Sequence, residues 1–493
     1  MHFATGLLVL SGLLFGAYWL VWIVYTLYFH PLSRYPGPAF AAISNIWYAR
    51  GWMSGCWLDI IQEAHATYGD VVRVGPNDLS FISAQALRDV YGPPGKGRKY
   101  FPKAEVFWKT FDAPGMTHIL DPEEAAAARN MLSPGFSPQA LRAQEHLILE
   151  YTDLFLSTID RIGVREQKPV DFTDAFNWLT FDILGELAFG ESFDAVKNAK
   201  THFWTSLILE ANFAQHLPSL LHRLPLLGLV SPLLISKKDR AIYVLHRQLT
   251  EEKTQRRIRR GDRARQDFFS HVLRRGGEQL TDEQLASHAS IFIMAGAETI
   301  STTLTAAVTF LAQNARCLRR LQAEVRSAFA TTHDITGEST AQLKYLKAVI
   351  EESLRCFPAV PVGLGRESPG ETVDGHYVPK GVMVLADMRL AALDPRNFVD
   401  PHKFLPERWI DGKHAVDRRL TNMAFNLGPR GCLGLNMAHV EMRIVLSKLV
   451  LAYDWALLDP DLDLVRDSRF FNLWKKPQVL VRLTPAGRDT PVM

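Results

Sequence analysis

A single cysteine in a glycine-rich turn constrains this chain more than any other feature. Residues Phe425 to Gly434 follow the pattern F-x-x-G-x-R-x-C-x-G, with Arg430 two residues before Cys432. Apolar residues spaced three or four apart predict a helix from Leu435 to Tyr453, directly after the turn. A helix N-terminus and a nearby arginine favour the thiolate, which is a ligand for soft metals. A lone cysteine is more often a buried free thiol, but the full ten-residue pattern favours a metal ligand.

The pattern resembles the heme-binding signature of the cytochrome P-450 family of heme-thiolate monooxygenases. The resemblance implies that Cys432 is the axial ligand of the iron in heme b (iron protoporphyrin IX) and that Phe425 belongs to the cofactor site. It also implies the cytochrome P-450 fold, a mainly α, triangular heme domain with small β-sheets, after an N-terminal transmembrane helix. The implied chemistry is activation of O2, in which the thiolate favours O–O cleavage, one oxygen atom enters the substrate and the other leaves as water.

The composition excludes several classes of protein. With 493 residues, of which 47% are hydrophobic and 22% are charged, the chain can bury a large core. A net charge of +3 is too balanced to indicate nucleic-acid binding. The four cysteines are far apart and form no C-x-x-C pair, which argues against a zinc site or a disulfide scaffold and indicates a reducing compartment.

The N-terminal segment Phe3 to Phe29 contains no charged residue. As a helix it would be about 40 Å long, enough to cross a hydrocarbon core of about 30 Å. A cleaved signal peptide is the alternative, but it is shorter and has a basic start, whereas the basic flank here follows the segment. We therefore predict residues 1–30 as a transmembrane signal anchor, 31–38 as a Pro-rich hinge and 39–493 as a cytosolic heme-thiolate catalytic domain. The resemblance places the anchor in the endoplasmic reticulum membrane.

Periodicity and turn residues predict further elements. Helices are expected over Trp57–Tyr68, from Asp121 onward, over Asp171–Phe189 and over Lys344–Phe357, and strands over Val71–Val74, Leu79–Ile82 and Gln478–Leu483. Val373–Val378 and Val382–Ala386 are predicted to pair as a hairpin around Pro379-Lys380-Gly381.

Two segments take their interpretation mainly from the resemblance, and a third takes it from its charge. Tyr91–Leu120 is predicted as loops that line the substrate site, and the Pro-interrupted stretch Ala199–Ser236 as a lid above it. The basic segment Lys253–Arg265 is either a solvated helix end or a contact with anionic lipid or an acidic partner. Side chains facing the substrate are also expected from Val360, Val362 and Leu364.

A long helix is predicted from a capping box at Thr281 to about Asn314. It contains Ala-Gly296-Ala-Glu298-Thr299, in which a glycine, an acid and a hydroxyl interrupt an apolar helix. From the residues alone, a kink with a satisfied Glu–Thr pair is the simpler interpretation. The resemblance implies a catalytic one: Gly296 makes room for dioxygen beside the iron, while Glu298 and Thr299 organise water that delivers protons.

Three arginines are implied as partners of the heme carboxylates. They are Arg129 in the helix that begins at Asp121, Arg366, and Arg430 in the cysteine turn. The family usually has His or Trp four residues before the first of these, and this chain has Ala125 there. One hydrogen bond to the cofactor is therefore expected to be missing.

A structural triad is implied for Glu352, Arg355 and Arg408. Glu352 and Arg355 lie three residues apart and hence on one helical face. A buried set of charges needs complete pairing, so these residues are expected to hold the core around the cysteine turn rather than to take part in chemistry.

The predicted activity is hydroxylation or another oxidation of a lipophilic small molecule. The chain has no G-x-G-x-x-G fingerprint and no room for a flavin domain, so electrons are expected from a membrane-bound NADPH–cytochrome reductase. Membrane lipid is the other predicted partner. The sequence resembles filamentous-fungal members that tailor secondary metabolites, which implies a polyketide, terpenoid or alkaloid substrate. Two alternatives stay open: a heme-thiolate isomerase, dehydratase or coupling enzyme without net oxygen insertion, and a non-catalytic membrane heme protein such as a sensor.

Overall fold

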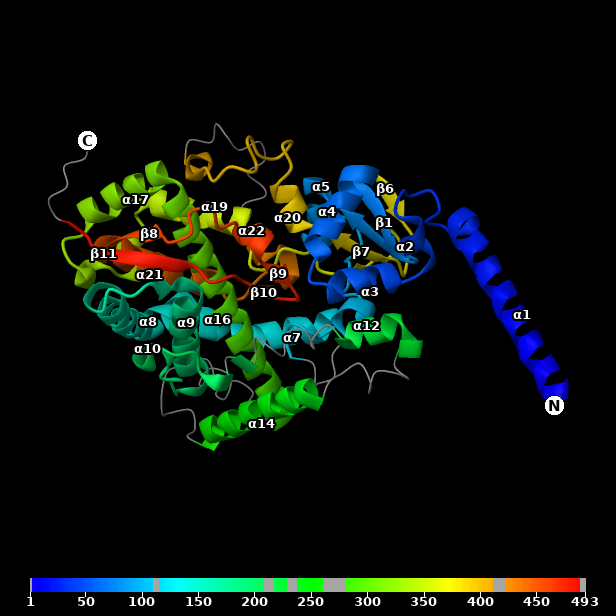
Figure 1. Cartoon of the computed structure of the whole chain (residues 1–493), viewed down its shortest axis with the longest axis horizontal. Coiled ribbons are helices and arrows are strands. Elements are labelled where there is room, and N and C mark those ends of the chain that lie inside the picture. Colours follow the sequence, from blue (N-terminus) through cyan, green and yellow to red (C-terminus); the bar gives the residue numbers. More distant parts are fainter. Residues whose placement is uncertain are drawn as a thin grey trace.

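The computed structural model shows a mainly helical body with small sheets and an N-terminal helix that stands apart from the body (Figure 1). The predicted fold class is therefore confirmed. The structure describes residues 2–109, 115–204, 206–207, 217–227, 237–259, 281–410 and 423–487.

The helices follow the predicted periodicity closely. Up to the middle of the chain they are α1 (His2–Val24), η1 (Tyr25–Phe29), α2 (Ala39–Ile43), α3 (Ile46–Met53), α4 (Trp57–Tyr68), α5 (Ala84–Tyr91), α6 (Glu105–Trp108), α7 (Pro122–Leu132), η2 (Ser133–Phe136), α8 (Pro138–Ile159), η3 (Asp160–Arg165), α9 (Phe172–Phe189), α10 (Ala195–Asn198), α12 (Leu217–Arg223) and α14 (Lys237–Arg259). After it they are α16 (Asp282–Gln313), α17 (Ala315–Ala328), η5 (Thr332–Asp334), α18 (Gly337–Thr340), α19 (Lys344–Cys356), α20 (Met388–Ala392), η6 (Pro406–Trp409), η8 (Met423–Phe425), η9 (Gly428–Arg430), α21 (Leu435–Ala452) and α22 (Leu464–Asp467).

The helix α16 is the centre of the body. Its first turn carries the predicted capping box, in which the Thr281 hydroxyl accepts from the Gln284 N–H and the Gln284 side chain accepts from the Thr281 N–H. Most of its side chains are buried, and it packs along α9 with α14, α19 and α21 beside it. Figure 1 shows α16 between a sheet near the N-terminal helix and a second sheet at the far end of the body.

The strands form four small sheets. They are β1 (Val71–Gly75), β2 (Asp78–Phe81), β3 (Val170–Asp171), β4 (Arg366–Glu367), β5 (Glu371–Val373), β6 (His376–Val378), β7 (Met383–Ala386), β8 (Tyr453–Leu457), β9 (Arg469–Phe470), β10 (Trp474–Lys475) and β11 (Leu480–Pro485). The sheet near the N-terminal helix has the order β1-β2-β7-β4, with β2 and β7 parallel. The far sheet has the order β3-β11-β8, and β9–β10 and β5–β6 are two-stranded.

The predicted hairpin of Val373–Val378 with Val382–Ala386 is wrong. The hairpin joins β5 to β6, and β7 pairs instead with β2 and β4. The reason is local: Asp374 and Gly375 have φ of +47° and +79°, the conformation that tight hairpin turns require. The Pro-Lys-Gly segment after β6 then leads the chain into another sheet.

Three predicted segments are described only in part. The predicted lid over Ala199–Ser236 is described at residues 199–204, 206–207 and 217–227, the last of which contain α12. The basic segment Lys253–Arg265 is described as far as Arg259, at the end of α14. The described residues of Tyr91–Leu120, at 91–109 and 115–120, are mostly loop, as predicted, with the short helix α6 among them.

The N-terminal helix points away from the body and exposes apolar side chains along its length (Figure 1). Thr5–Phe29 is long and apolar enough to cross a membrane. Among the described residues α16 passes the same test, but α16 is mostly buried inside the body. The exposed apolar helix suggests a membrane anchor.

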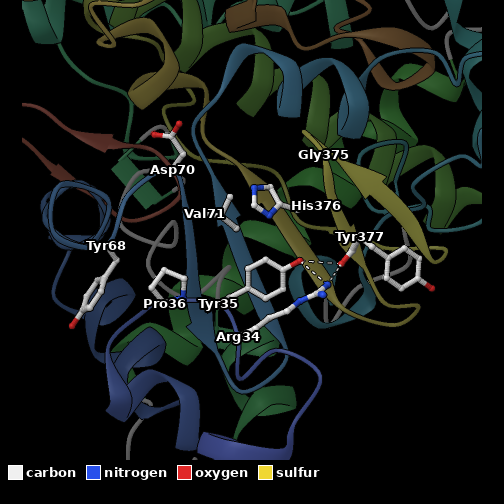
Figure 2. Close-up of a pocket in the computed structure, with 9 residues that line it drawn as sticks. All are labelled: Arg34, Tyr35, Pro36, Tyr68, Asp70, Val71, Gly375, His376 and Tyr377. Atoms are coloured by element: carbon white, nitrogen blue, oxygen red, sulfur yellow. Dashed lines mark hydrogen bonds between the residues drawn. The ribbon is translucent and has the colours of Figure 1, made fainter.

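The segment between this helix and the body is tied down at several points. Figure 2 shows the hydroxyl of Tyr35 and the guanidinium of Arg34 both donating to the carbonyl oxygen of Tyr377, at 2.9 and 2.8 Å, beside a surface pocket of about 570 Å³. The buried Arg73 of β1 donates to the carbonyl oxygen of Thr26 at 2.7 Å. Because a helix C-terminus carries partial negative charge, this arginine stabilises the end of the N-terminal helix against the sheet.

Candidate active site

The cysteine turn is fixed by its own backbone and by a neighbouring segment. The N–H of Cys432 donates to the carbonyl oxygen of Phe425 at 2.7 Å, and that of Gly431 donates to Gly428 at 3.0 Å. Gly428 has φ of +63°, and a Cβ there would lie 2.5 Å from the carbonyl oxygen of Tyr91. Glycine is therefore required at the first Gly of the pattern by both backbone conformation and close approach.

The turn opens onto a cavity of about 410 Å³. Cys432 lies deep in the molecule, and its side chain is accessible from this cavity. The other walls come from α7, α16 and the segment after α19. Its apolar lining includes Phe136, Leu184, Ile291, Phe292, Leu433 and Met437. A cavity with this apolar lining suits a flat organic cofactor or a lipophilic ligand.

The electrostatics of Cys432 differ in one respect from the sequence prediction. Burial raises the pKa of the thiol, while the N–H groups of Gly434 and Leu435 and the charge of Arg129 oppose the rise. The helix N-terminus thus acts as predicted, but the arginine that favours the thiolate is Arg129 of α7 rather than Arg430 of the turn. A metal cation bound to this sulfur would hold it as a thiolate.

The three predicted cofactor arginines have different surroundings, although all line the cavity. Arg366 in β4 is 1% exposed, and its Nη1 has no hydrogen-bond partner among the described residues. Arg129 donates from Nη1 to the carbonyl oxygen of Gly431 at 2.6 Å. Most N–H groups of Arg430 are used, since it donates to the Tyr100 hydroxyl and to the carbonyl oxygens of Ile119, Leu120 and Asp121. Arg366 and Arg129 are thus better placed than Arg430 to bind an anionic group.

A buried lysine, Lys103, also lines this cavity and was missed by the sequence analysis. Its backbone bridges to that of Arg366, and its Nζ lies 3.9 Å from the ring centre of Trp108. Ala125, four residues before Arg129, lines the cavity as well and contributes no polar atom from its side chain. No local pattern marks Lys103, because its burial depends on β4.

The motif in α16 meets the cavity with two of its three predicted residues. Gly296 and Thr299 line the cavity. The hydroxyl of Thr299 donates to the carbonyl oxygen of Ala295 at 2.6 Å. A Cβ at Gly296 would lie 2.8 Å from a methyl group of Leu184, so this glycine also allows α9 to approach α16 closely.

Glu298 is not among the residues that line the cavity. Its Oε1 accepts from Nζ of Lys476 at 2.6 Å, and both side chains are 2% exposed. Lys476 also donates to the Thr302 hydroxyl at 2.8 Å, whereas Oε2 of Glu298 has no partner among the described residues. Sequence reasoning missed Lys476, which lies 178 residues further along the chain and has no pattern of its own.

Glu352, Arg355 and Arg408 form one buried cluster. Arg355 donates to both carboxylate oxygens of Glu352, at 2.9 and 2.8 Å, and Arg408 donates to Oε1 at 3.0 Å. The Leu405 N–H and the Trp409 indole N–H, each at 2.9 Å, complete the set around the same carboxylate. The full pairing explains how these charges stay buried. The cluster ties α19 to η6, away from the cavity lining.

The remaining predictions concern apolar and aromatic residues. Val360, Leu364 and Phe425 line the cavity, while Val362 is buried in the core. Among the described residues, no group of three His, Cys, Asp or Glu side chains is placed to hold a metal ion.

Comparison with known proteins gives a consistent result along the chain. A family model described as Cytochrome P450 matches residues 36–481. Cytochrome P450 monooxygenase BOA3 of Botryotinia fuckeliana (strain B05.10) is 39% identical over 481 residues, which cover 95% of this chain and 94% of that protein. Cytochrome P450 monooxygenase btcC of Colletotrichum orbiculare is 37% identical, with 99% and 97% covered. Cytochrome P450 monooxygenase astJ of Aspergillus oryzae is 36% identical, with 96% of each covered.

Proposed function

Because this chain belongs to the cytochrome P450 family and is a monooxygenase, we propose that it oxidises a lipophilic small molecule at a heme whose iron is bound by Cys432. One observation carries this proposal. The Cys432 side chain opens into an apolar cavity that also presents the Thr299 hydroxyl and the unpartnered Nη1 of Arg366, within the described part of the chain.

The residues of the cavity fit heme b. This group combines an iron that accepts a soft ligand, a flat apolar ring and two carboxylates. Cys432 supplies the sulfur, and Arg366 and Arg129 supply N–H groups to the carboxylates. When bound, heme supplies the reductive activation of O2, one atom of which enters the substrate while the other becomes water.

The chain's own residues bind, orient and exclude water. Phe292 and Ile291 of α16 belong to a wall that keeps bulk water out and favours a lipophilic substrate. Gly296 has no side chain and so leaves space in the cavity beside Thr299. Phe425 packs at the cysteine turn, with its ring 5.2 Å from that of His439. The Glu352 cluster keeps a structural role, because its hydrogen bonds join α19 to η6.

Proton handling divides between two residues of the motif. Thr299 holds a hydroxyl proton at the cavity wall, where it donates to the Ala295 carbonyl oxygen and rotates to serve another acceptor. Glu298 must exchange its partner Lys476 before it passes a proton toward the cavity. The contribution of Glu298 to proton delivery therefore depends on Lys476.

The exposed apolar helix and the need for electrons support the proposed location and partners. The exposed apolar helix α1 suits residues 1–30 as the anchor, residues 31–38 as the connection and residues 39–493 as the catalytic domain. An NADPH–cytochrome reductase in the same membrane, the endoplasmic reticulum, supplies the electrons. The anchor keeps both proteins in one plane and exposes the enzyme to substrates dissolved in lipid.

The substrate class is a polyketide, terpenoid or alkaloid of fungal secondary metabolism. Two observations support this assignment. The cavity lining is mainly apolar, and the similar monooxygenases named above come from filamentous fungi. Comparison of metabolites from cells with and without the full chain identifies the compound consumed.

The test uses the full chain in membranes together with an NADPH–cytochrome reductase. After reduction and CO treatment, the expected result is the absorption band of a thiolate-bound heme, and Cys432→Ala lacks this band. With NADPH and isotopically labelled O2, the product carries the label. Absence of the band overturns the cofactor assignment. Product formed without NADPH and O2 overturns oxygen insertion and supports the isomerase, dehydratase or coupling alternative. A CO band without turnover of any candidate class supports a sensor.

A further inference from the structure

Lys103 is a buried ammonium group without a counter-ion among the described residues. It is 8% exposed, and its Nζ donates to the carbonyl oxygen of Thr117 and lies over the ring of Trp108. Neither contact neutralises its charge. A buried cation without a counter-ion is unfavourable, so the position of Lys103 in the wall of the cavity requires an explanation.

The environment of Lys103 makes the charge harder to keep. Burial, and then the nearby charges of Arg366 and Arg430, hold the pKa of Lys103 well below its usual value. Three cations thus face one region of the cavity, and no carboxylate of the described residues pairs with Lys103 or Arg366. An anionic ligand that spans this region would act as a counter-ion for all three side chains and reduce the repulsion between them.

The same region lacks one of the usual donors. Ala125 stands where the family's pattern has a hydrogen-bonding side chain, and it lines the same cavity. Arg430 donates most of its N–H groups to the hydroxyl of Tyr100 and to backbone carbonyl oxygens. Arg366 is left with an unpartnered Nη1, as judged within the described residues.

We infer that Lys103 binds a heme carboxylate together with Arg366 and Arg129, and thereby replaces the hydrogen bond that Ala125 cannot make. This inference rests on the proposed function. A dianionic group matches Lys103, Arg366 and Arg129 better than a substrate with a single carboxylate does, because each of these three side chains has N–H groups available. The backbone bridge between Lys103 and Arg366 keeps two of these cations side by side.

The experiment measures the rate of heme transfer from the holoenzyme to an excess of a heme-scavenging apoprotein. Lys103→Met removes the charge and keeps the apolar stem. Heme loss is expected to become about 10- to 100-fold faster, as expected for one charge-assisted hydrogen bond. Lys109→Met is the matched control: Lys109 lines the same cavity but is 46% exposed and pairs with Glu105 at 2.6 Å. Its rate is expected to equal that of the wild type.

Two further variants separate carboxylate binding from a merely structural role. Ala125→His restores the missing donor, so adding it to Lys103→Met is expected to slow heme loss again. Reconstitution with the dimethyl ester of heme removes the carboxylates, so the difference between Lys103→Met and the wild type is expected to vanish. A difference of the same size with the ester shows that Lys103 acts only on folding, which overturns the inference.

The remaining outcomes separate this inference from the proposed function. If the wild type shows no thiolate-heme band after reduction and CO treatment, the proposed function fails. If the wild type binds heme and Lys103→Met loses it no faster than Lys109→Met does, only the inference about Lys103 fails. Unchanged heme loss with a raised KM for an acidic substrate also overturns it, and assigns Lys103 to the substrate.

Discussion

Replacing Lys476 by Met tests a buried charge pair beside the candidate site. Lys476 and Glu298 are joined at 2.6 Å, and both side chains are 2% exposed. After the replacement, the Glu298 carboxylate keeps only the Thr302 hydroxyl at 3.3 Å, and its Oε2 is already unpartnered among the described residues. The variant therefore leaves a carboxylate buried without a cation.

The magnitude follows from this burial. Removing one partner of a buried ion pair destabilises a protein by about 3–5 kcal/mol. The unfolding entropy of a chain of this size is about 1 kcal/mol/K, so the midpoint of thermal unfolding is expected to fall by about 3–5 °C. Lys168→Met is the matched control: Lys168 pairs with Glu166 at 2.8 Å, but the two side chains are 67% and 37% exposed. Because solvent screens such an exposed pair, its loss is expected to leave the midpoint nearly unchanged.

The assay is thermal unfolding of the full-length holoenzyme in detergent, followed by circular dichroism at one scan rate. Adding Glu298→Gln to Lys476→Met removes the unpaired charge and is expected to restore most of the lost stability. The reasoning is refuted if Lys476→Met lowers the midpoint no more than Lys168→Met does. It is also refuted if the double variant is less stable than Lys476→Met alone.

Three other changes test separate parts of the structure. Thr299→Ala removes the hydroxyl at the cavity wall, so product per NADPH consumed is expected to fall by about 100-fold, the lower range of general acid–base effects; unchanged coupling contradicts this role. Burial raises the pKa of Glu441 from 4.5 to about 8. Between these two pH values the folded state holds a proton that the unfolded state releases. The free energy of unfolding of the wild type therefore falls as pH rises from 4.5 to about 8, by up to about 1.4 kcal/mol per pH unit. Glu441→Gln lacks this dependence, so its midpoint of thermal unfolding is expected to rise relative to that of the wild type between about pH 5.5 and 7.5. A difference between the two midpoints that stays constant over this range contradicts the raised pKa. Arg73→Met removes the donor to the Thr26 carbonyl oxygen, and limited proteolysis between the N-terminal helix and the body is expected to become faster, whereas an unchanged rate shows that other contacts hold this junction.

The helices could be predicted well because their signals are local. The capping box at Thr281 and the apolar spacing of α16 lie within a few turns of one another, and the observed bounds agree with them. The hairpin around Pro379-Lys380-Gly381 was predicted wrongly, because strand pairing depends on distant partners. The Asp374-Gly375 turn was the local signal that identifies the true hairpin.

The candidate site could be predicted only as far as its motifs reach. Cys432 and Thr299 carry their own patterns and do line the cavity. Lys103 and Lys476 have none, and each is defined by residues far along the chain that surround it in the fold. The placement of Glu298 outside the cavity lining has the same cause. Helical spacing predicts which residues are neighbours within α16, but it does not predict which side chains from other segments contact them.

Two arginines link the cysteine turn to α7 in both directions. Arg129 of α7 donates to the carbonyl oxygen of Gly431 in the turn, and Arg430 of the turn donates to the carbonyl oxygens just ahead of α7, at Ile119 and Leu120. Each segment thus fixes the other by a charged group, and the charge of Arg129 acts directly on the Cys432 thiol. Because Arg430 serves this link, fewer of its N–H groups remain for a cofactor carboxylate. Arg430 holds the backbone in place, and the inferred role of Lys103 is to provide the cation for a cofactor carboxylate that Arg430 provides less well.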